Sequence, residues 1–253
     1  MKEILVIIPA YNEAENIGPV LDELLQPDLS RLADVVVIND FSSDNTVEVV
    51  KSRGIKVLNN PYNMGYGSSI QLGYKYAASR HYRYVIQMDA DGQHDCSNIL
   101  PIYQELGKAD QDGNHPDIVL GSRFVTNDQI VGDMTVSGIK KLAIRLFRKV
   151  IWLLTKKTIL DPTSGLQGLS YRAYSSYAQY GNFDDRFPDS NMILQMLLSG
   201  YRIREIPAIM HNRTVGTSMH SGLKPIIYMI RMSLSLMAVW IHASYQQRKN
   251  AKK

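Results

Sequence analysis

The chain is poor in cysteine, lacks a signal segment and carries only a small excess of positive charge. Cys96 is the single cysteine among 253 residues, so no internal disulfide is possible and a reducing compartment is the simpler interpretation. Met1 is followed by a short apolar run rather than the long apolar segment of a signal peptide, which predicts that the chain remains in the cytoplasm. The formal net charge of +4 is too small to indicate a nucleic-acid-binding protein.

Long uncharged apolar runs are also missing. A membrane-spanning helix needs roughly 18 such residues, and the nearest run, residues 226–241, is shorter and contains Arg231. No internal repeat or low-complexity linker is present. The composition, 45% hydrophobic and 21% charged, is that of a globular protein with one large domain and at most an appendage.

The first half of the chain alternates short apolar runs with helical patterns. The apolar runs are predicted strands at residues 4–8, 35–38, 56–58, 84–88 and 118–120. Helical patterns between them cover residues 13–25, 45–52 and 68–79. Nearly continuous apolar strands joined by helices are typical of a buried parallel sheet. We therefore predict an α/β fold with a doubly wound, mostly parallel sheet.

The predicted strands end in polar residues rather than in glycines. Asn39-Asp40 and Asp89-Ala90-Asp91 each follow a strand, at the edge where ligands bind in open α/β sheets. Neither G-x-G-x-x-G after the first strand nor G-x-x-x-x-G-K-[ST] anywhere is present. These absences argue against a Rossmann dehydrogenase and a P-loop kinase, so a phosphate-bearing ligand would need a metal ion or arginines.

Asp89 and Asp91 form the candidate metal site. Residues two apart in extended backbone point to the same side, so both carboxylates can converge on one point. Two hard oxygen ligands with open positions suit Mg²⁺ or Mn²⁺ bridging a diphosphate. Gln93 and His94 lie close enough in sequence to complete the shell, although the histidines show no metal-ligand spacing.

Two later segments are predicted to be helices with unusual surfaces. Residues 137–155 form a predicted amphipathic helix that has one apolar face and basic residues on the rest of its surface. Such a helix fits a membrane interface or, alternatively, packs on the core with its basic face outward. Residues 224–245 are apolar over most of a helix and must be covered by their own domain, a partner subunit or lipid. A further helix near residues 192–198 and a strand near residues 203–206 complete the prediction.

Five ordered motifs resemble family-2 glycosyltransferases with the GT-A fold. They are Ile7-Ile8-Pro9-Ala10-Tyr11-Asn12-Glu13, Asn39-Asp40-Phe41-Ser42-Ser43-Asp44-Asn45-Thr46, Asn63-Met64-Gly65-Tyr66-Gly67, Met88-Asp89-Ala90-Asp91-Gly92-Gln93-His94 and Gly121-Ser122-Arg123. The sequence is most similar to the polyprenyl-phosphate, dolichol-phosphate mannose synthase-like group, through Asp161-Pro162-Thr163-Ser164-Gly165 and Arg213-x-x-Gly216-x-Ser218. The resemblance covers roughly residues 4–220.

The resemblance implies a role for each matching residue. It places the UDP- or GDP-sugar donor at Pro9, Tyr11, Glu13, Asp40 and Asp89, with the nucleoside at the first four. It assigns the metal to Asp89, Asp91 and Gln93, phosphate binding to Arg123 and Arg213, and the acceptor to Ser164, Gly165 and Lys140.

The resemblance also makes Asp189 the candidate base, because Phe187-Pro188-Asp189-Ser190 matches a motif whose acidic residue often precedes a helix in this family. Its role has two interpretations. A sugar hydroxyl acceptor would need a carboxylate to take its proton. A lipid phosphate is already largely ionised, because its second pKa is about 6, and Asp189 would then position the acceptor or cap the following helix. Asp184 and Asp185 are nearby alternatives.

The sequence therefore predicts an inverting, metal-dependent transferase that moves sugar onto a polyprenyl phosphate for cell-envelope glycan synthesis. We expect a catalytic domain over residues 1–220 and a helix and basic tail over residues 221–253. Attachment to the cytoplasmic face of the membrane would be peripheral, through lipid, a small membrane protein or self-association. The alternatives are a transferase acting on saccharides or proteins, and a non-catalytic nucleotide-sugar-binding scaffold for a membrane partner.

Overall fold

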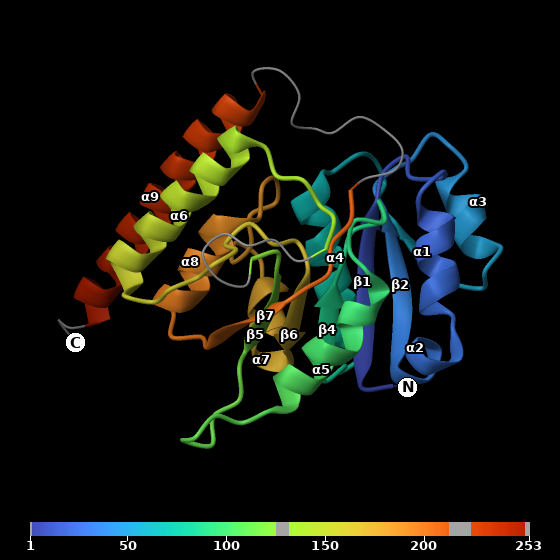
Figure 1. Cartoon of the computed structure of the whole chain (residues 1–253), viewed down its shortest axis with the longest axis horizontal. Coiled ribbons are helices and arrows are strands. Elements are labelled where there is room, and N and C mark those ends of the chain that lie inside the picture. Colours follow the sequence, from blue (N-terminus) through green and yellow to red (C-terminus); the bar gives the residue numbers. More distant parts are fainter. Residues whose placement is uncertain (1, 125–131, 213–223, 251–253) are drawn as a thin grey trace.

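A central seven-stranded sheet forms the body of the molecule (Figure 1). The computed structural model describes residues 2–124, 132–212 and 224–250. The strands are β1 (Ile4–Ala10), β2 (Ala33–Asn39), β3 (Lys56–Asn59), β4 (Tyr84–Gln87), β5 (Ile118–Ser122), β6 (Gln167–Ser170) and β7 (Ile203–Pro207). The helices are α1 (Ile17–Leu24), α2 (Pro27–Leu32), α3 (Thr46–Lys51), α4 (Tyr66–Ser79), the short 3-10 helix η1 (Cys96–Asn98), α5 (Ile99–Gly107), α6 (Gly138–Thr155), α7 (Tyr171–Tyr177), α8 (Ser190–Leu198) and α9 (Lys224–Asn250).

The sheet is mostly parallel, as the sequence predicts. Its strand order is β3-β2-β1-β4-β6-β5-β7. β6 runs antiparallel to both of its neighbours, β4 and β5, whereas the other paired strands are parallel. β4 and β5 therefore point the same way, and the carboxyl ends of β1, β2, β4 and β5 lie along one edge of the sheet.

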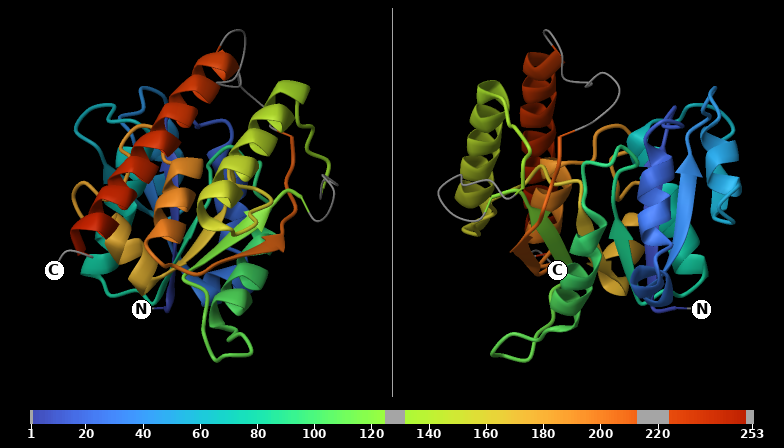
Figure 2. Two further views of the ribbon diagram at one scale, coloured as in Figure 1. Left: turned by 90° about the vertical axis from the view of Figure 1, so that its left-hand side faces the viewer. Right: turned by 45° about the vertical axis from the view of Figure 1, so that its right-hand side comes forward.

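Helices cover both faces of the sheet (Figure 2). Alternate residues of β1 enter two different cores: Leu5 and Ile7 pack on the side of α4, α7 and α8, and Ile4 and Val6 on the side of α1, α3 and α5. All four side chains are fully buried. Burial on both faces explains why the strands read as continuous apolar runs rather than as alternating patterns.

Five elements are missing from the sequence prediction: α2, η1, α5, β6 and α7. β6 has only four residues and includes Gly168. A Cβ at Gly168 would lie 2.3 Å from the Ile102 side chain, so the strand depends on close packing against α5. Such a tertiary contact leaves no periodic signal in the sequence.

The C-terminal helix α9 packs on α8 and α6. Met232 and Leu236 are buried in the same core as α4, whereas the opposite face of α9 is exposed. Residues Ile227–Gln246 are long and apolar enough, by length and composition alone, to cross a membrane. This finding overturns the expectation that no segment of the chain qualifies, because a helix of this length tolerates the single charge of Arg231.

Candidate active site

Asp89 lies just beyond β4 and is oriented by two neighbouring side chains. The Tyr66 hydroxyl at the start of α4 donates to Asp89 Oδ1 at 2.8 Å. The Asp89 backbone N–H donates to Nδ1 of buried His94 at 3.0 Å, which leaves Nε2, 3.8 Å from Asp89 Oδ2, to carry the proton of a neutral ring. Sequence reasoning missed Tyr66 as an active-site residue, although it lies within a quoted motif.

A chain of buried polar groups fixes Tyr66 in turn. Gln87 at the end of β4 donates to the Tyr66 hydroxyl at 3.3 Å and to the Gly165 carbonyl at 3.0 Å, and it accepts from Tyr74 at 2.6 Å. A Cβ at Gly165 would lie 3.0 Å from Asp89 Oδ2. Gly165, expected at the acceptor, therefore allows its loop to approach the carboxylate closely.

Asp91 and Gln93 belong to the turn that follows. Asp91 Oδ1 accepts from the Gln93 backbone N–H at 3.1 Å. Within residues 2–124, 132–212 and 224–250, no three histidine, cysteine or acidic side chains gather as a metal site. β4 ends at Gln87 and Asp91 lies in the following turn, so the two side chains do not share one extended strand as expected from the sequence. As oxygen donors, Asp89 and Asp91 suit Mg²⁺ or Mn²⁺, which commonly take their remaining ligands from substrate phosphates and water. Orientation of each carboxylate by a hydrogen bond is what metal ligands require.

Asp40, at the carboxyl end of β2, is buried and holds a neighbouring loop. Its Oδ1 accepts from the Met64 backbone at 2.8 Å and from Asn60 Nδ2 at 2.7 Å, and its Oδ2 accepts from the Gly65 backbone at 2.9 Å. Asp40, the residue expected to bind the nucleoside, therefore also holds the start of α4, where Tyr66 lies.

The loops after β1 and β2 are linked by hydrogen bonds. Asn12 donates its backbone N–H to Ser42 and accepts from the Ser43 backbone at 2.8 Å. The Ala14 N–H donates to Asp44 Oδ2 at 3.0 Å. Among the expected nucleoside residues at this edge, Pro9 is buried within β1, Tyr11 is half exposed and Glu13 accepts from Asn16.

Arg123 lies in a buried ion pair. Its Nε is 2.7 Å and its Nη2 2.5 Å from the two carboxylate oxygens of Asp161, and Nη2 also donates to Thr163. Burial disfavours both charges, yet each partner stabilises the other: the pKa of Asp161 is lowered and that of Arg123 is raised. The expected phosphate ligand thus has much of its guanidinium engaged by Asp161, and Ser164 donates its hydroxyl to the Gly121 carbonyl.

Asp189 precedes α8 and faces the C-terminal helix. Asp189 is the N-cap residue of α8, and its backbone carbonyl accepts from Met192 at 2.9 Å, but its side chain makes no capping hydrogen bond. Instead, Asp189 Oδ2 accepts from the hydroxyl of Tyr228 on α9. Burial raises the pKa of Asp189 to about 6, against the opposing effects of Tyr228 and Arg123. Nothing in the local sequence signals Tyr228, which is distant along the chain.

Three candidate residues remain: Lys140, Asp184 and Arg213. Lys140, near the start of α6, has a pKa lowered by burial and by Arg123, while Asp161, Asp189 and Asp89 oppose the shift, so it belongs to this cluster of charges. Asp184 accepts from the Arg186 and Phe187 backbones and from Asn191, as a turn residue does. Arg213 lies outside the described residues.

The start of α4 and the turn at Asp184 are in direct contact. The Ser68 backbone donates to the Asp185 carbonyl at 3.0 Å. A Cβ at Gly67 would lie 2.3 Å from the Asp184 carbonyl oxygen. Only glycine fits here, and it brings the Tyr66 side of the site next to the segment that leads to Asp189.

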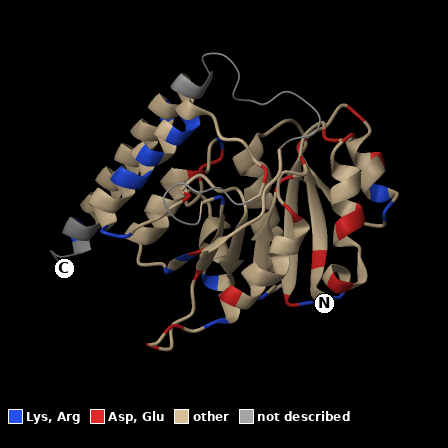
Figure 3. Ribbon diagram, in the orientation of Figure 1, with Lys and Arg blue, Asp and Glu red and all other residues tan. Residues whose placement is uncertain are grey.

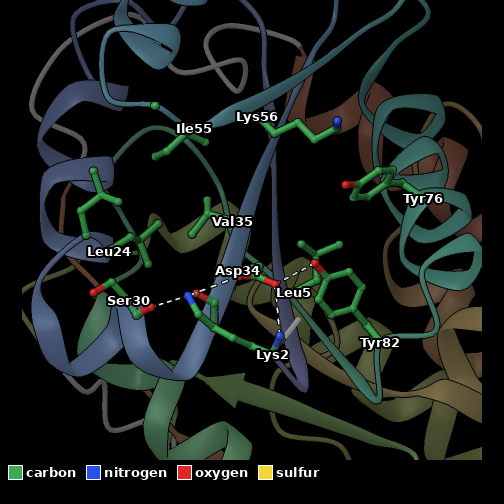
Figure 4. A pocket seen from close by; sticks show the side chains of 13 residues that line it. Lys2, Leu5, Leu24, Ser30, Asp34, Val35, Ile55, Lys56, Tyr76 and Tyr82 are labelled. Carbon is green, nitrogen blue, oxygen red and sulfur yellow. Dashed lines mark hydrogen bonds and ion pairs between the residues drawn. The ribbon is translucent and has the colours of Figure 1, made fainter.

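A cavity of about 320 Å³ lies at the opposite, amino end of the sheet (Figure 4). Lys2 Nζ donates to the Ser30 and Ala33 carbonyls, and the Tyr82 hydroxyl donates to Asp34 at 2.9 Å. These groups satisfy one another and lie away from the carboxyl edge. The cavity is therefore a structural feature rather than a second candidate for the active site.

The fold and the carboxylate pair at the strand ends define a glycosyltransferase. The model of the family "Glycosyl transferase family 2" matches residues 5–177, and the chain belongs to this family. An undecaprenyl-phosphate mannosyltransferase of Micrococcus luteus is 27% identical over 230 residues, which cover 87% of this chain and 88% of that protein. A dolichol-phosphate mannosyltransferase of Pyrococcus furiosus is 30% identical over 172 residues, covering 66% of this chain and 46% of that protein.

The solved structures show the same fold. Glucosyl-3-phosphoglycerate synthase of Mycobacterium tuberculosis, in complex with Mn²⁺, UDP-glucose and phosphoglyceric acid, is similar with a TM-score of 0.64 and 18% identity. The similarity covers 95% of this chain and 79% of the synthase. At this identity the comparison establishes the GT-A fold, which confirms the fold class predicted from the motifs.

Proposed function

We propose that this glycosyltransferase moves a sugar from a nucleotide-sugar onto a polyprenyl phosphate, with inversion at the anomeric carbon. The observation that carries the proposal is the position of Asp189, which lies between the carboxylate edge of the sheet and the acid-free helices α6 and α9. The Micrococcus relative named as an undecaprenyl-phosphate mannosyltransferase, which matches along most of both chains, supports the same acceptor class.

The donor end is formed by the strand termini. Pro9, Tyr11, Glu13 and Asp40 would bind the nucleoside of UDP or GDP. Asp89, Asp91 and Gln93 would hold Mg²⁺ or Mn²⁺, which would neutralise the departing diphosphate. Tyr66 and His94 keep Asp89 in place for that task.

At the acceptor end, Asp189 has a pKa of about 6, which matches the second pKa of a phosphate monoester, also about 6. Near pH 6, where part of the lipid phosphate keeps its last proton, Asp189 accepts that proton. At higher pH the phosphate is already ionised, and Asp189 positions it for attack. The phosphate oxygen then forms the bond to the anomeric carbon as the bond to the nucleoside diphosphate breaks. Attack from the side opposite the leaving group inverts the configuration.

Cationic groups would hold the acceptor phosphate. Lys140 contributes its ammonium group from α6, and Arg213 is proposed by motif alone. Arg123 has a different part: because Asp161 and Thr163 engage its guanidinium, it lowers the local cost of negative charge near Asp189. Ser164 and Gly165 shape the loop beneath the acceptor.

Helices α6 and α9 form the proposed membrane surface. Neither contains an Asp or Glu, and Figure 3 shows basic residues along α6. The exposed apolar side chains are Ile139, Leu142, Leu146, Trp152 and Leu153 on α6, and Ile227, Ile230, Leu234, Met237, Trp240, Ile241 and Tyr245 on α9. An apolar face with basic and no acidic neighbours suits an anionic membrane surface. We propose peripheral attachment at the cytoplasmic face, with residues 1–220 catalytic, residues 221–253 contacting lipid, and a role in cell-envelope glycan synthesis.

The test is a transfer assay with defined donors and acceptors. Purified protein is incubated with a panel of UDP- and GDP-sugars, a short polyprenyl phosphate in vesicles, and Mg²⁺ or Mn²⁺. We expect a polyprenyl-phosphate sugar whose anomeric configuration, read by NMR, is opposite to that of the donor. Chelation of the metal should abolish the product, and Asp91→Asn should reduce it by at least a hundredfold.

Two results would contradict the proposal. Extension of soluble saccharides with no lipid product would reassign the acceptor. Consumption of no donor, together with unchanged nucleotide-sugar binding by Asp91→Asn, would indicate a binding scaffold instead of an enzyme.

A further inference from the structure

The Asp189 side chain and the C-terminal helix meet in a polar contact. The Tyr228 hydroxyl donates to Asp189 Oδ2. The rest of the interface between α8 and α9 is largely apolar, with Met232 and Leu236 buried. The hydroxyl thus reaches the candidate base from a helix that the family model, which ends at residue 177, does not include.

The position of Tyr228 is fixed by its surroundings. Its ring packs edge-on against Phe147 of α6, with centroids 6.2 Å apart. Farther along α9, Ser235 accepts from Asn191 Nδ2 at 2.9 Å, and Asn191 Oδ1 accepts from the Asp189 backbone at 2.8 Å. The hydroxyl is therefore aimed at Asp189 by packing with α6 and α8.

We propose that Tyr228 is a positioning residue that orients the Asp189 carboxylate for the acceptor, so that the docking of α9 completes the active site. The proposal rests on the function proposed above. Ile227 and Ile230, beside Tyr228, are exposed on the face assigned to lipid. The helix α9 would therefore both contact the membrane and orient Asp189.

The titratable groups around Asp189 determine how much the Tyr228 contact changes its pKa. These groups are Arg123 and its partner Asp161, Lys140 on α6 and Tyr66 on α4. A hydrogen bond donated to a carboxylate favours its ionised form. Without the hydroxyl, burial acts with less opposition and the pKa of Asp189 rises further.

The experiment compares Tyr228→Phe with Tyr82→Phe, which removes a tyrosine hydroxyl that donates to Asp34 at the opposite end of the sheet. In the lipid-phosphate assay, Tyr228→Phe should move the acidic limb of the kcat profile upward by about one pH unit. This shift lowers kcat about fivefold at pH 6, leaves it almost unchanged at pH 8 and leaves the donor KM as in the wild type. Tyr82→Phe should keep the wild-type profile.

A second measurement does not need activity. In protein with ¹³C-labelled aspartate carboxyls, the Asp189 signal is assigned by its loss in Asp189→Asn and is titrated in each variant. An upward displacement in Tyr228→Phe alone supports the proposal. Equal titration midpoints in Tyr228→Phe and the wild type, or a uniform fall in kcat at every pH, overturn it. If the wild type transfers no sugar to lipid phosphate, the proposed function fails while the titration still decides the contact.

Discussion

Arg123 and Asp161 form a buried ion pair in which the guanidinium contacts both carboxylate oxygens, at 2.7 Å and 2.5 Å. Both side chains are almost wholly removed from solvent. Asp161 Oδ2 also accepts from the Arg123 backbone N–H at 3.0 Å. The pair joins the end of β5 to the loop before β6, and both of its charges act on the pKa of nearby Asp189.

Asp161→Asn should strongly destabilise the protein. Removing one partner leaves the Arg123 charge buried without compensation, which costs about 3–5 kcal/mol. The free energy of unfolding, measured by urea denaturation, should fall by that amount. Asp22→Asn, which breaks the exposed pair with Arg53, is the control and should lower the free energy of unfolding far less, because solvent screens an exposed pair. Equal losses in the two variants would contradict the role of the buried pair.

Tyr66→Phe should weaken metal binding without unfolding the protein. The substitution removes only the hydroxyl that orients Asp89, and loss of such a partner typically costs about 10–100-fold in metal affinity or activity. Mn²⁺ titration followed by electron paramagnetic resonance measures the change. Tyr82→Phe removes a hydroxyl bonded to Asp34 at the opposite end of the sheet and should bind Mn²⁺ like the wild type. Unchanged affinity in Tyr66→Phe would show that Asp89 needs no such partner.

Gly67→Ala should destabilise the protein by about 1–3 kcal/mol, because the new Cβ meets backbone that cannot move aside as a side chain can. Thermal unfolding measures the loss. Gly107→Ala, at the end of α5 with no atom within 4 Å of its Cβ position, should be neutral or slightly stabilising. Full stability in Gly67→Ala would refute the close approach of α4 to Asp184.

Asp189→Asn should stabilise the protein at neutral pH while removing activity. The pKa of Asp189 is about 6 in the folded protein and about 3.9 when unfolded. Between these values the folded state binds more protons, so the free energy of unfolding contributed by Asp189 falls as pH rises. Because the side chain keeps some solvent contact, we expect a gain of about 1–2 kcal/mol at pH 7.5. The gain should vanish below about pH 4, where both states are protonated; a gain that persists there would contradict the assignment.

Leu234→Glu should reduce membrane binding. Leu234 is exposed on the outer face of α9, and a carboxylate there opposes both burial in lipid and attraction to anionic headgroups. Sedimentation with vesicles containing anionic lipid should show at least a tenfold weaker partition. Leu100→Glu places the same charge at an exposed leucine of α5 and should leave binding unchanged. Equal binding by all three proteins would remove α9 from the membrane surface.

The sequence revealed the parts of the fold that depend on local pattern. Long apolar strands such as β1 and β2, and the amphipathic period of α6, identify themselves because burial dictates their composition. The sequence did not predict β6 and α7, because they are short and are stabilised by packing against α5 and α4 respectively. At the site, the motifs located Asp89 and Asp189 but gave no partners. Tyr228 and Asp161 are set opposite their partners by tertiary structure, which spacing along the chain does not encode.

The hydrogen bonds between the loops after β1 and β2 have an entropic consequence. Asn12 and Asp44 join these two loops, and Asp40 ties in the start of α4. A ligand that must order loose loops spends part of its interaction energy on restricting them. Here the expected nucleoside edge is ordered in advance by its own side chains. The affinity for the nucleoside can therefore be reached with few direct contacts, and binding should proceed without a slow closing step.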